Sequence, residues 1–393
     1  MRTLKAFPAL LGIVLILQAC GNAGVMPTNS PSATVPAVTE PSVAESTATA
    51  TPAGEFFSAI PFKSGFGFRA PWLELYFIDP TSPFAQRETG GVDAIVASSI
   101  LAATQSVDVA LRFLSQDSIT KALITASHRG IPVRVVAETD ELAERSDFQI
   151  LTEAGIAVVD DQQPGLMNNT FIVIDRSQVW TGSLDYGVSG VFRRYNTAVR
   201  IFSPELAVNY IKEFDEMFVN KQFGQLIVPE TPYPSVVIQG TQVDVLFSPD
   251  DFVVSRLSQV LGGAQESIHF LANTFASTQL GTIIREKAAQ GIVVAGVLEF
   301  DRVDPSRVDS NPGLIEEWNL FQQAGLDVRL DSKPEVMNHN MMIIDGKIVV
   351  IGSYDFTNRA ENENDENVLI IYNEAIARKF MEEFQRVQSR AQQ

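Results

Sequence analysis

Two stretches of this sequence decide the fold: "MNNTFIVIDRSQVWTGSLD" at residues 167–185 and "MNHNMMIIDGKIVVIGSYD" at residues 337–355. Each predicts an apolar strand, a turn at its Asp, a second short strand and a Gly-Ser turn. The two stretches lie 170 residues apart. An internal repeat on this scale indicates that one folding unit occurs twice.

The repeat extends to both sides of these stretches. "SVDVALRFLSQDSITKALITASHRGIPVRVVAET" from Ser106 matches "SIHFLANTFASTQLGTIIREKAAQGIVVAGVLEF" from Ser267, and each predicts a strand, an amphipathic helix, a Gly turn and a second strand. A further strand and helix close each half, in "AVRIFSPELAVNYIKEFDEMF" and "NVLIIYNEAIARKFMEEFQRV". Alternating strands and helices predict an α/β fold of two homologous lobes, which we expect at residues 56–228 and 235–393. We expect the lobes to pack about a pseudo-twofold axis.

The N-terminus predicts a lipid-anchored secreted protein. A basic start precedes an apolar stretch at residues 7–17, which is too short for a transmembrane helix and suits a secretory signal. The stretch ends in "LQAC", which resembles the bacterial lipoprotein signal, and Cys20 is the only cysteine. We expect a signal peptide over 1–19, attachment of lipidated Cys20 to the extracytoplasmic face of a bacterial cell membrane, and a disordered tether over 20–55.

The composition argues against several partners. The chain has 29 Lys and Arg against 47 Asp and Glu, a formal net charge of −18, and loss of Arg2 and Lys5 with the signal takes it to −20. Such a chain repels phosphate backbones, which argues against a nucleic-acid partner and against a nuclease. A single cysteine excludes an intrachain disulfide. No pattern in the sequence indicates a cofactor, and none identifies a metal site.

The repeated stretches resemble the phospholipase D superfamily, whose signature H-x-K-x4-D is followed by a short strand and a G-S-x-N turn, once in each half. The resemblance implies two phospholipase D-like lobes, each a mixed sheet flanked by helices. Asp175 and Asp345 stand at the Asp of the signature, and Ser183 and Ser353 at the Ser of the turn. Both Asp residues follow a strand, where a carboxylate accepts backbone hydrogen bonds, so we interpret them as structural.

The catalytic positions of that signature hold other residues. The family uses one histidine to attack phosphorus, the other to transfer protons, and two lysines to neutralise the phosphoryl oxygens. Here the histidine positions hold Asn168 and Asn338, the lysine positions Thr170 and Asn340, and the last position of each turn Asp185 and Asp355. A carboxamide nitrogen has its lone pair delocalised into the carbonyl. We therefore expect no phosphoryl transfer.

The charges at these positions also argue against a phosphate ligand. Two cations are lost and two anions gained, and each such charge contributes on the order of 1 to 4 kcal/mol in a wet cleft. We therefore expect the site to repel phosphate. The side chains expected in the cleft between the lobes are Asn168, Thr170, Ser183, Asp185, Asn196, Asn338, Asn340, Ser353, Asp355, Glu366 and Asn367. Glu366-Asn367 matches a Glu-Asn pair that often follows the motif, whereas the first half has Tyr195-Asn196.

The chain has three histidines, His128, His269 and His339. His339 is a weak catalytic candidate because it lies between Asn338 and Asn340, yet alternate residues of a strand face opposite sides. If the two Asn side chains face the cleft, His339 faces away. His269 is expected on a strand, and His128 at a helix end.

These residues leave several functions open. The first is a lipid-anchored pseudoenzyme that binds a polar ligand or a protein partner. The alternative is a divergent phospholipase D-type phosphodiesterase that hydrolyses phospholipid or another phosphodiester. The oxygen-rich cleft suits sugar hydroxyls or a hard cation such as Ca²⁺, and it is also compatible with a polar groove of no function.

Overall fold

The computed structural model describes residues 56–142, 146–224, 231–307, 310–331 and 335–392. The predicted signal peptide, Cys20 and the predicted tether lie outside these residues. The chain divides into two units, Met1–Pro52 and Ala53–Gln393, and the described residues all belong to the second. None of their helices is long and apolar enough to cross a bilayer.

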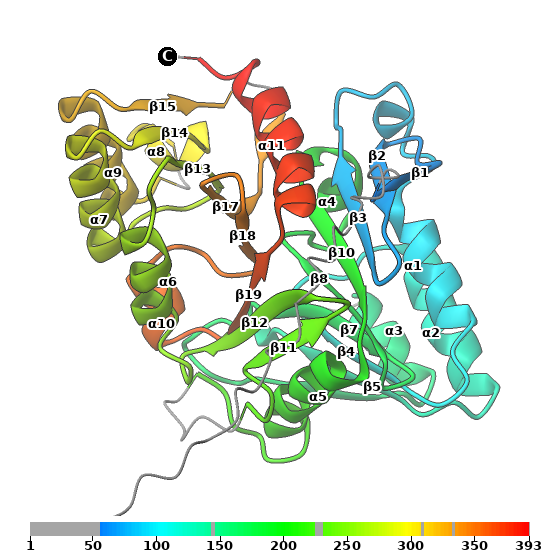
Figure 1. Cartoon of the computed structure of the whole chain (residues 1–393). Coiled ribbons are helices and arrows are strands. Elements are labelled where there is room, and N and C mark those ends of the chain that lie inside the picture. The colour runs from blue at the N-terminus through cyan, green and yellow to red at the C-terminus, as the bar shows by residue number, and fades with distance from the viewer. Residues whose placement is uncertain (1–55, 143–145, 225–230, 308–309, 332–334, 393) are drawn as a thin grey trace, which may run out of the picture. The chain divides into compact units, whose positions relative to one another are not determined.

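The first lobe contains a mixed sheet (Figure 1). Its strand order is β1 (Ser58–Ile60), β2 (Gly65–Arg69), β3 (Leu73–Ile78), β10 (Thr197–Phe202), β8 (Gln178–Gly182), β7 (Thr170–Ile174), β4 (Val107–Leu111), β5 (Val133–Ala137) and β6 (Ala157–Asp160). Strands β4, β5 and β6 are parallel, and β7 pairs with β4 in the antiparallel sense.

The second lobe repeats this topology. Its strand order is β11 (Ser235–Ile238), β12 (Thr241–Ser248), β19 (Glu366–Tyr372), β18 (Ile348–Gly352), β17 (Asn340–Ile344), β13 (Ser267–Ala272), β14 (Val293–Leu298) and β15 (Asp327–Leu330). Again three strands are parallel, β13, β14 and β15, and the motif strand β17 is antiparallel to β13. The prediction of two homologous lobes with mixed sheets is confirmed.

Helices cover both faces of each sheet. Helices α1 (Val92–Leu101), α2 (Asp117–His128) and α3 (Asp147–Glu153) share one buried core with the first sheet. Helices α6 (Val253–Gly262), α7 (Thr278–Ala289) and α9 (Pro312–Gln323) do the same for the second. The shorter elements are η1 (Ala85–Arg87), η2 (Thr139–Glu141), α4 (Val188–Phe192), α8 (Phe300–Val303), α10 (Asn358–Asn362), and strands β9 (Arg194–Tyr195) and β16 (Val336–Met337).

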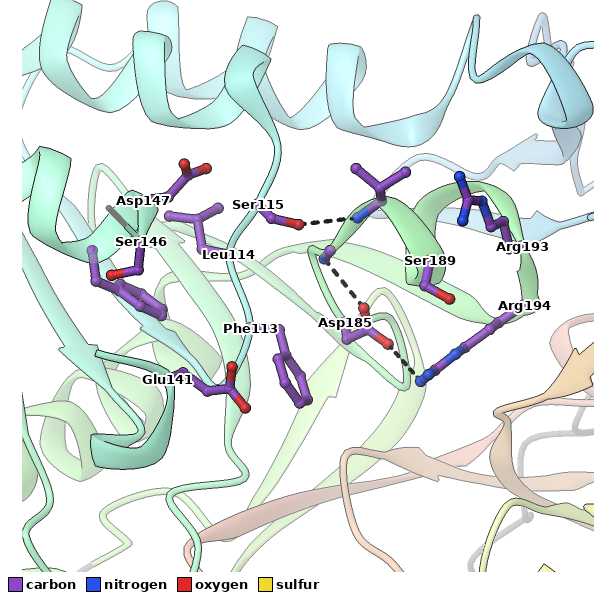
Figure 2. Close-up of a pocket in the computed structure, with 13 residues that line it drawn as sticks. Phe113, Leu114, Ser115, Glu141, Ser146, Asp147, Asp185, Ser189, Arg193 and Arg194 are labelled. Carbon is purple, nitrogen blue, oxygen red and sulfur yellow. Dashed lines mark hydrogen bonds and ion pairs between the residues drawn. The ribbon is translucent and has the colours of Figure 1, made fainter. Parts of the chain in front are cut away.

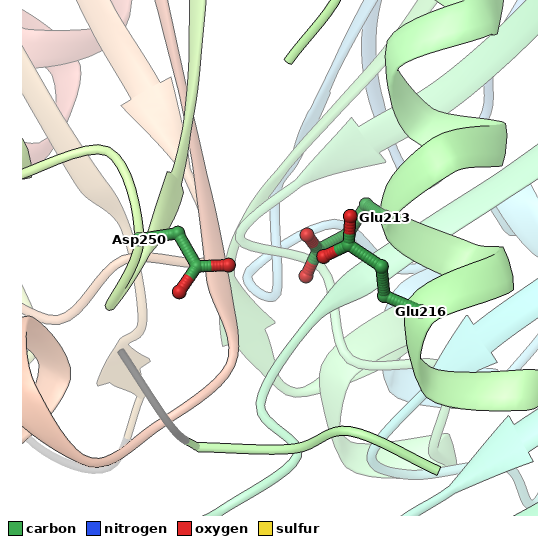
Figure 3. A group of neighbouring side chains, drawn as sticks. All are labelled: Glu213, Glu216 and Asp250. Carbon is green, nitrogen blue, oxygen red and sulfur yellow. The ribbon is translucent and has the colours of Figure 1, made fainter. Parts of the chain in front are cut away.

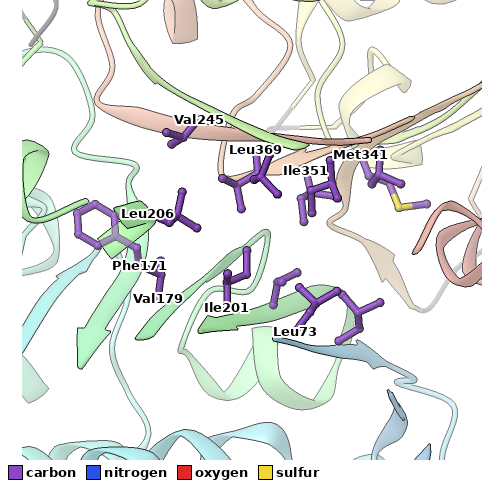
Figure 4. Packing of buried hydrophobic residues seen from close by; sticks show 14 of the residues in the cluster. Leu73, Phe171, Val179, Ile201, Leu206, Val245, Met341, Ile351 and Leu369 are labelled. Carbon is purple, nitrogen blue, oxygen red and sulfur yellow. The ribbon is translucent and has the colours of Figure 1, made fainter. Parts of the chain in front are cut away.

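A third core joins the lobes. It combines the inner faces of both sheets with α5 (Pro204–Phe218) and α11 (Glu374–Gln388) (Figure 4). The ring of Tyr210 on α5 lies 5.0 Å from that of Phe171 in one sheet and 5.1 Å from that of Phe247 in the other. Because both faces of each sheet are covered, the central strands are mostly apolar on both faces rather than alternating.

The lobes also contact each other through paired main chains. β9 is parallel to β16, with Tyr195 opposite Met337. Met167 forms an isolated parallel bridge with Asp365. Adding 170 to Tyr195 and subtracting 170 from Met337 converts the first pair into the second, as a twofold relation between the lobes requires.

Candidate functional site

Both motif strands begin at one pocket between the lobes, which we call the inter-lobe pocket. Asn168 and Asn338 precede β7 and β17 by two residues and both line it. Its volume is about 180 Å³. The complete lining is Arg112, Phe113, Asn168, Thr170, Ser183, Asp185, Arg194, Asn273, Arg302, Asn338, Asn340, Ser353 and Asp355.

Eight of the eleven residues expected in the cleft are therefore brought together. The other three, Asn196, Glu366 and Asn367, are fully buried and do not line the pocket. They lie behind it and hold the lining side chains in place. The Nδ2 of Asn168 donates to Oε1 of Glu366 at 3.1 Å, and the Nδ2 of Asn338 donates to Oδ1 of Asn196 at 2.9 Å.

These hydrogen bonds correct the expected alignment of the two halves. With the 170-residue offset, Asn196 corresponds to Glu366, because each accepts from the Asn at the opposite histidine position. Thr197 then corresponds to Asn367. The expected pairing of Tyr195-Asn196 with Glu366-Asn367 is wrong by one residue, since no contact was available in the sequence to fix the register.

The amide groups of the pocket are used mainly as donors to the protein itself. Asn338 donates to the main-chain oxygen of Ser183 at 3.2 Å as well as to Asn196. Asn340 donates to the main-chain oxygen of Ser353 and to Oδ1 of Asp355, while its own Oδ1 is buried without a partner among the described residues. An unpartnered acceptor of this kind favours a ligand that carries a donor.

The acidic groups at the pocket are partly neutralised. Burial raises the pKa of Asp185, and Arg194, whose Nη1 lies 3.3 Å from its Oδ2, offsets part of that rise. Burial likewise raises the pKa of Asp355. Behind them, burial and then the charge of Asp355 raise the pKa of Glu366 well above its usual value.

The expectation that the pocket repels phosphate assumed a site without cations, and that premise is wrong, because three arginines line the pocket: Arg112, Arg194 and Arg302. With Asp185 and Asp355 as the acidic lining residues, the arginines outnumber the carboxylates even when both are ionised. The Nε atoms of Arg112 and Arg194 are buried without a hydrogen-bond partner in the described structure. Guanidinium groups suit planar contacts with phosphate and carboxylate oxygens.

These arginines lie outside the motifs, which is why the motif positions did not indicate them. Arg112 directly follows β4, and the last residue of β4 pairs with Thr170. This register places Arg112 beside the first motif. The repeat places Asn273 at the equivalent point of the second lobe, where it also lines the pocket. Arg302 lies in the longer connection of the second half, on α8.

None of the three histidines, all of which are described, lines the pocket. His339 is fully buried, with Nδ1 2.9 Å from Oγ1 of Thr197 and Nε2 2.8 Å from Oε1 of Glu383 on α11. The 170-residue offset pairs it with Asn169, which donates to Glu213 on α5. His269 lies on β13 beside Phe384, and His128 ends α2.

The two signature aspartates also lie away from the pocket. Asp175 accepts backbone N–H groups from residues 104–106, and Asp345 accepts them from residues 265–267. Burial raises the pKa of each, yet these hydrogen bonds outweigh it and hold both pKa values below the usual range. They join the motif turn to the start of β4 in the first lobe and of β13 in the second.

A separate acidic group lies at the junction of α5 and the loop after β12 (Figure 3). The carboxylate oxygens of Glu213, Glu216 and Asp250 lie within 4.8 Å of one another. Burial and then the neighbouring charge of Asp365 raise the pKa of Glu213 well above its usual value. This group is not part of the inter-lobe pocket.

The family match covers both lobes. The model of the family "Cardiolipin synthase, PLD-like domain" matches residues 96–218 and 257–388. The chain therefore belongs to the phospholipase D superfamily, with two domains of this kind. Crystallised phosphatidylserine synthase of Haemophilus influenzae Rd KW20 has the same fold, with a TM-score of 0.61, 12% identity, and coverage of 86% of this chain and 88% of that one.

Two relatives with named activities match in sequence. The mitochondrial cardiolipin hydrolase of Homo sapiens is 33% identical over 134 residues, which are 34% of this chain and 50% of that protein. A phospholipase D of Rickettsia felis is 32% identical over 125 residues, 32% of this chain and 62% of that protein. The matched region thus spans only half to three-fifths of the relatives' length.

Proposed function

We propose that this chain is a non-catalytic phospholipase D-like protein that binds an anionic, phosphate-bearing ligand in the inter-lobe pocket. The observation that carries the proposal is the pair Asn168 and Asn338 at the histidine positions of the signature, both lining the pocket. Neither carboxamide offers a nucleophilic nitrogen, and both amino groups already donate to Glu366 and Asn196.

The three arginines support a binding role. Arg112 forms no ion pair within 4.0 Å among the described residues, and its charge offsets part of the burial-driven rise in the pKa of Glu141, Asp185 and Asp355. Its Nη1 donates to Oδ1 of Asn168 at 3.2 Å, and its guanidinium lies 4.8 Å from the centre of the Phe113 ring. The guanidinium of Arg112 is therefore held beside the first motif, where it supplies a positive charge but neither a base nor a nucleophile.

The proposal includes the location of the protein. We infer attachment through lipidated Cys20 to the extracytoplasmic face of a bacterial membrane, with residues 20–55 as the tether. The ligand would then be a compound of that compartment, or a phosphorylated group on a partner. The sequence that precedes Cys20 and its position as the sole cysteine support this part.

Titration calorimetry with inorganic phosphate, combined with turnover assays on bis(4-nitrophenyl) phosphate and phosphatidylcholine, tests the function. The proposal predicts phosphate binding and no hydrolysis above the buffer rate. The alternative is a divergent phosphodiesterase, favoured by the similarity to a cardiolipin hydrolase and by the cations of the pocket. Hydrolysis that is lost in Asn338→Ala would establish that alternative.

A further inference from the structure

A larger cavity lies beside the inter-lobe pocket, within the first lobe. We call it the side chamber, and its volume is about 570 Å³ (Figure 2). It shares Phe113, Asp185 and Arg194 with the inter-lobe pocket, so the two spaces adjoin. The Oδ1 of Asp185 accepts from the N–H of Gly187 at 3.2 Å. This hydrogen bond fixes the Asp185 side chain, which lies between the two spaces, to the residue that precedes α4.

The two lobes differ at this place in a way that explains the chamber. Leu114 bridges to Tyr186 in the first lobe, and Phe275 bridges to Phe356 in the second. Phe275 thus stands where the first lobe has the smaller Leu114. Its ring lies 5.6 Å from those of Phe321 and Phe356, so an aromatic cluster packs at the place in the second lobe that corresponds to Leu114.

The sizes of the two spaces imply a ligand of two parts. One water occupies about 30 Å³ in the liquid, so a pocket of about 180 Å³ holds roughly six waters, enough for a phosphate group. The side chamber falls within the usual range of about 300 to 1,000 Å³ for small-molecule sites. If a phosphate group occupies the inter-lobe pocket, the organic group bonded to it can occupy the side chamber.

The lining of the chamber combines apolar side chains with hydroxyls and carboxylates, a mixture that suits a hydroxylated substituent with an apolar face. Ser115, Ser146 and Ser189 contribute hydroxyls, and Glu141 and Asp147 contribute carboxylates. The carboxylate of Glu141 has no hydrogen-bond or ion-pair partner among the described residues, and burial raises its pKa. An acyl chain would remove water from these carboxylates without offering donors, which is unfavourable. Sugar or polyol hydroxyls would donate to them.

We propose that the ligand is a phosphorylated sugar or polyol, with its phosphate in the inter-lobe pocket and its hydroxylated body in the side chamber. This inference rests on the proposed anion-binding function. Arg194 lies at the boundary and its buried Nε–H, which has no partner in the described structure, would donate to an oxygen near the phosphate. The apolar face of the body would lie on Phe113 and Val188.

Calorimetry on the full mature protein tests the inference with four ligands: inorganic phosphate, glycerol 1-phosphate, glucose 6-phosphate and dihexanoyl phosphatidic acid. We expect glucose 6-phosphate to bind about tenfold or more tightly than inorganic phosphate, because hydrogen bonds to charged groups are worth roughly this factor or more. Leu114→Phe, which copies the second lobe, should remove that gain and leave the affinity for inorganic phosphate within about twofold.

Ser189→Phe blocks the chamber from a half-buried position, and it replaces Leu114→Phe if that variant does not fold. Ser98→Phe on the exposed face of α1 is the matched control and should change nothing. Equal affinity for inorganic phosphate and both polyol phosphates would overturn the inference alone, as would tightest binding by phosphatidic acid. If no phosphate compound binds, the proposed function fails as well.

Discussion

Replacing Arg112 removes a lining arginine that donates a hydrogen bond to Asn168 at the histidine position of the first motif. Its Nη1 contacts Asn168, and it has no carboxylate partner within 4.0 Å in the described residues, although its charge acts on Asp185 and Asp355. A hydrogen bond to a charged group is worth about 1.5 to 3 kcal/mol. At about 1.4 kcal/mol per tenfold, Arg112→Ala should weaken phosphate binding by about 10- to 140-fold.

The assay is calorimetric titration with inorganic phosphate at low ionic strength, because salt screens exposed charges. Arg378→Ala is the control, since Arg378 lies on α11 with a 68% exposed side chain and the change alters the net charge equally. The control should bind phosphate like the wild type. The reasoning is refuted if Arg112→Ala binds normally, or if both variants lose affinity to the same degree, because the effect would then be one of overall charge.

Three further predictions concern stability. Asp175→Asn should lower the free energy of unfolding by about 1 to 3 kcal/mol, because one carboxamide oxygen replaces a carboxylate that accepts three backbone N–H groups. His339→Ala should destabilise the fold by about 1 to 3 kcal/mol, because buried Glu383 loses one hydrogen-bond partner and keeps Arg386, and it should leave phosphate affinity unchanged. Burial and then Glu299 raise the pKa of Asp331 to about 8, so Asp331→Asn should reduce the loss of stability between about pH 4 and pH 8.

Denaturant unfolding at several pH values checks these three. The pKa of Asp175 is lowered, so its contribution is present above the unfolded pKa and disappears as the pH falls through the folded one. The pKa of Asp331 is raised instead of lowered, so the folded state favours its protonated form. The stability that this form provides is lost as the pH rises from about 4 through about 8. A change in phosphate affinity in His339→Ala, or identical pH profiles for Asp331→Asn and wild type, would contradict the account.

The repeat in the sequence was enough to predict the two lobes, since strand and helix periodicity survives in both copies. The motif spacing also predicted which polar side chains meet, because Asn168 and Asn338 occupy the same position before equivalent strands. The burial of His339 follows the same logic of alternating strand faces. Its partner Glu383 comes from α11, which the motif alone does not indicate.

The arginines and the side chamber could not be predicted from the motifs. Arg112 reaches the pocket through the pairing of β4 with β7, and Arg302 from α8, at a position where the first half has Glu141 on η2. At the chamber the first lobe has Leu114 where the second has Phe275, and both positions appear as ordinary apolar residues in the sequence. Long-range register and packing, rather than local pattern, decide these features.

The most direct test of the central claim is ³¹P NMR of a soluble phosphodiester, such as glycerophosphocholine, with the protein in molar excess. Binding without phosphoryl transfer predicts a shifted or broadened diester resonance that persists for hours, with no phosphomonoester signal. A phosphomonoester product, or a phosphoryl adduct on any residue of the inter-lobe pocket, would show that the amide-lined site is catalytic and contradict the account.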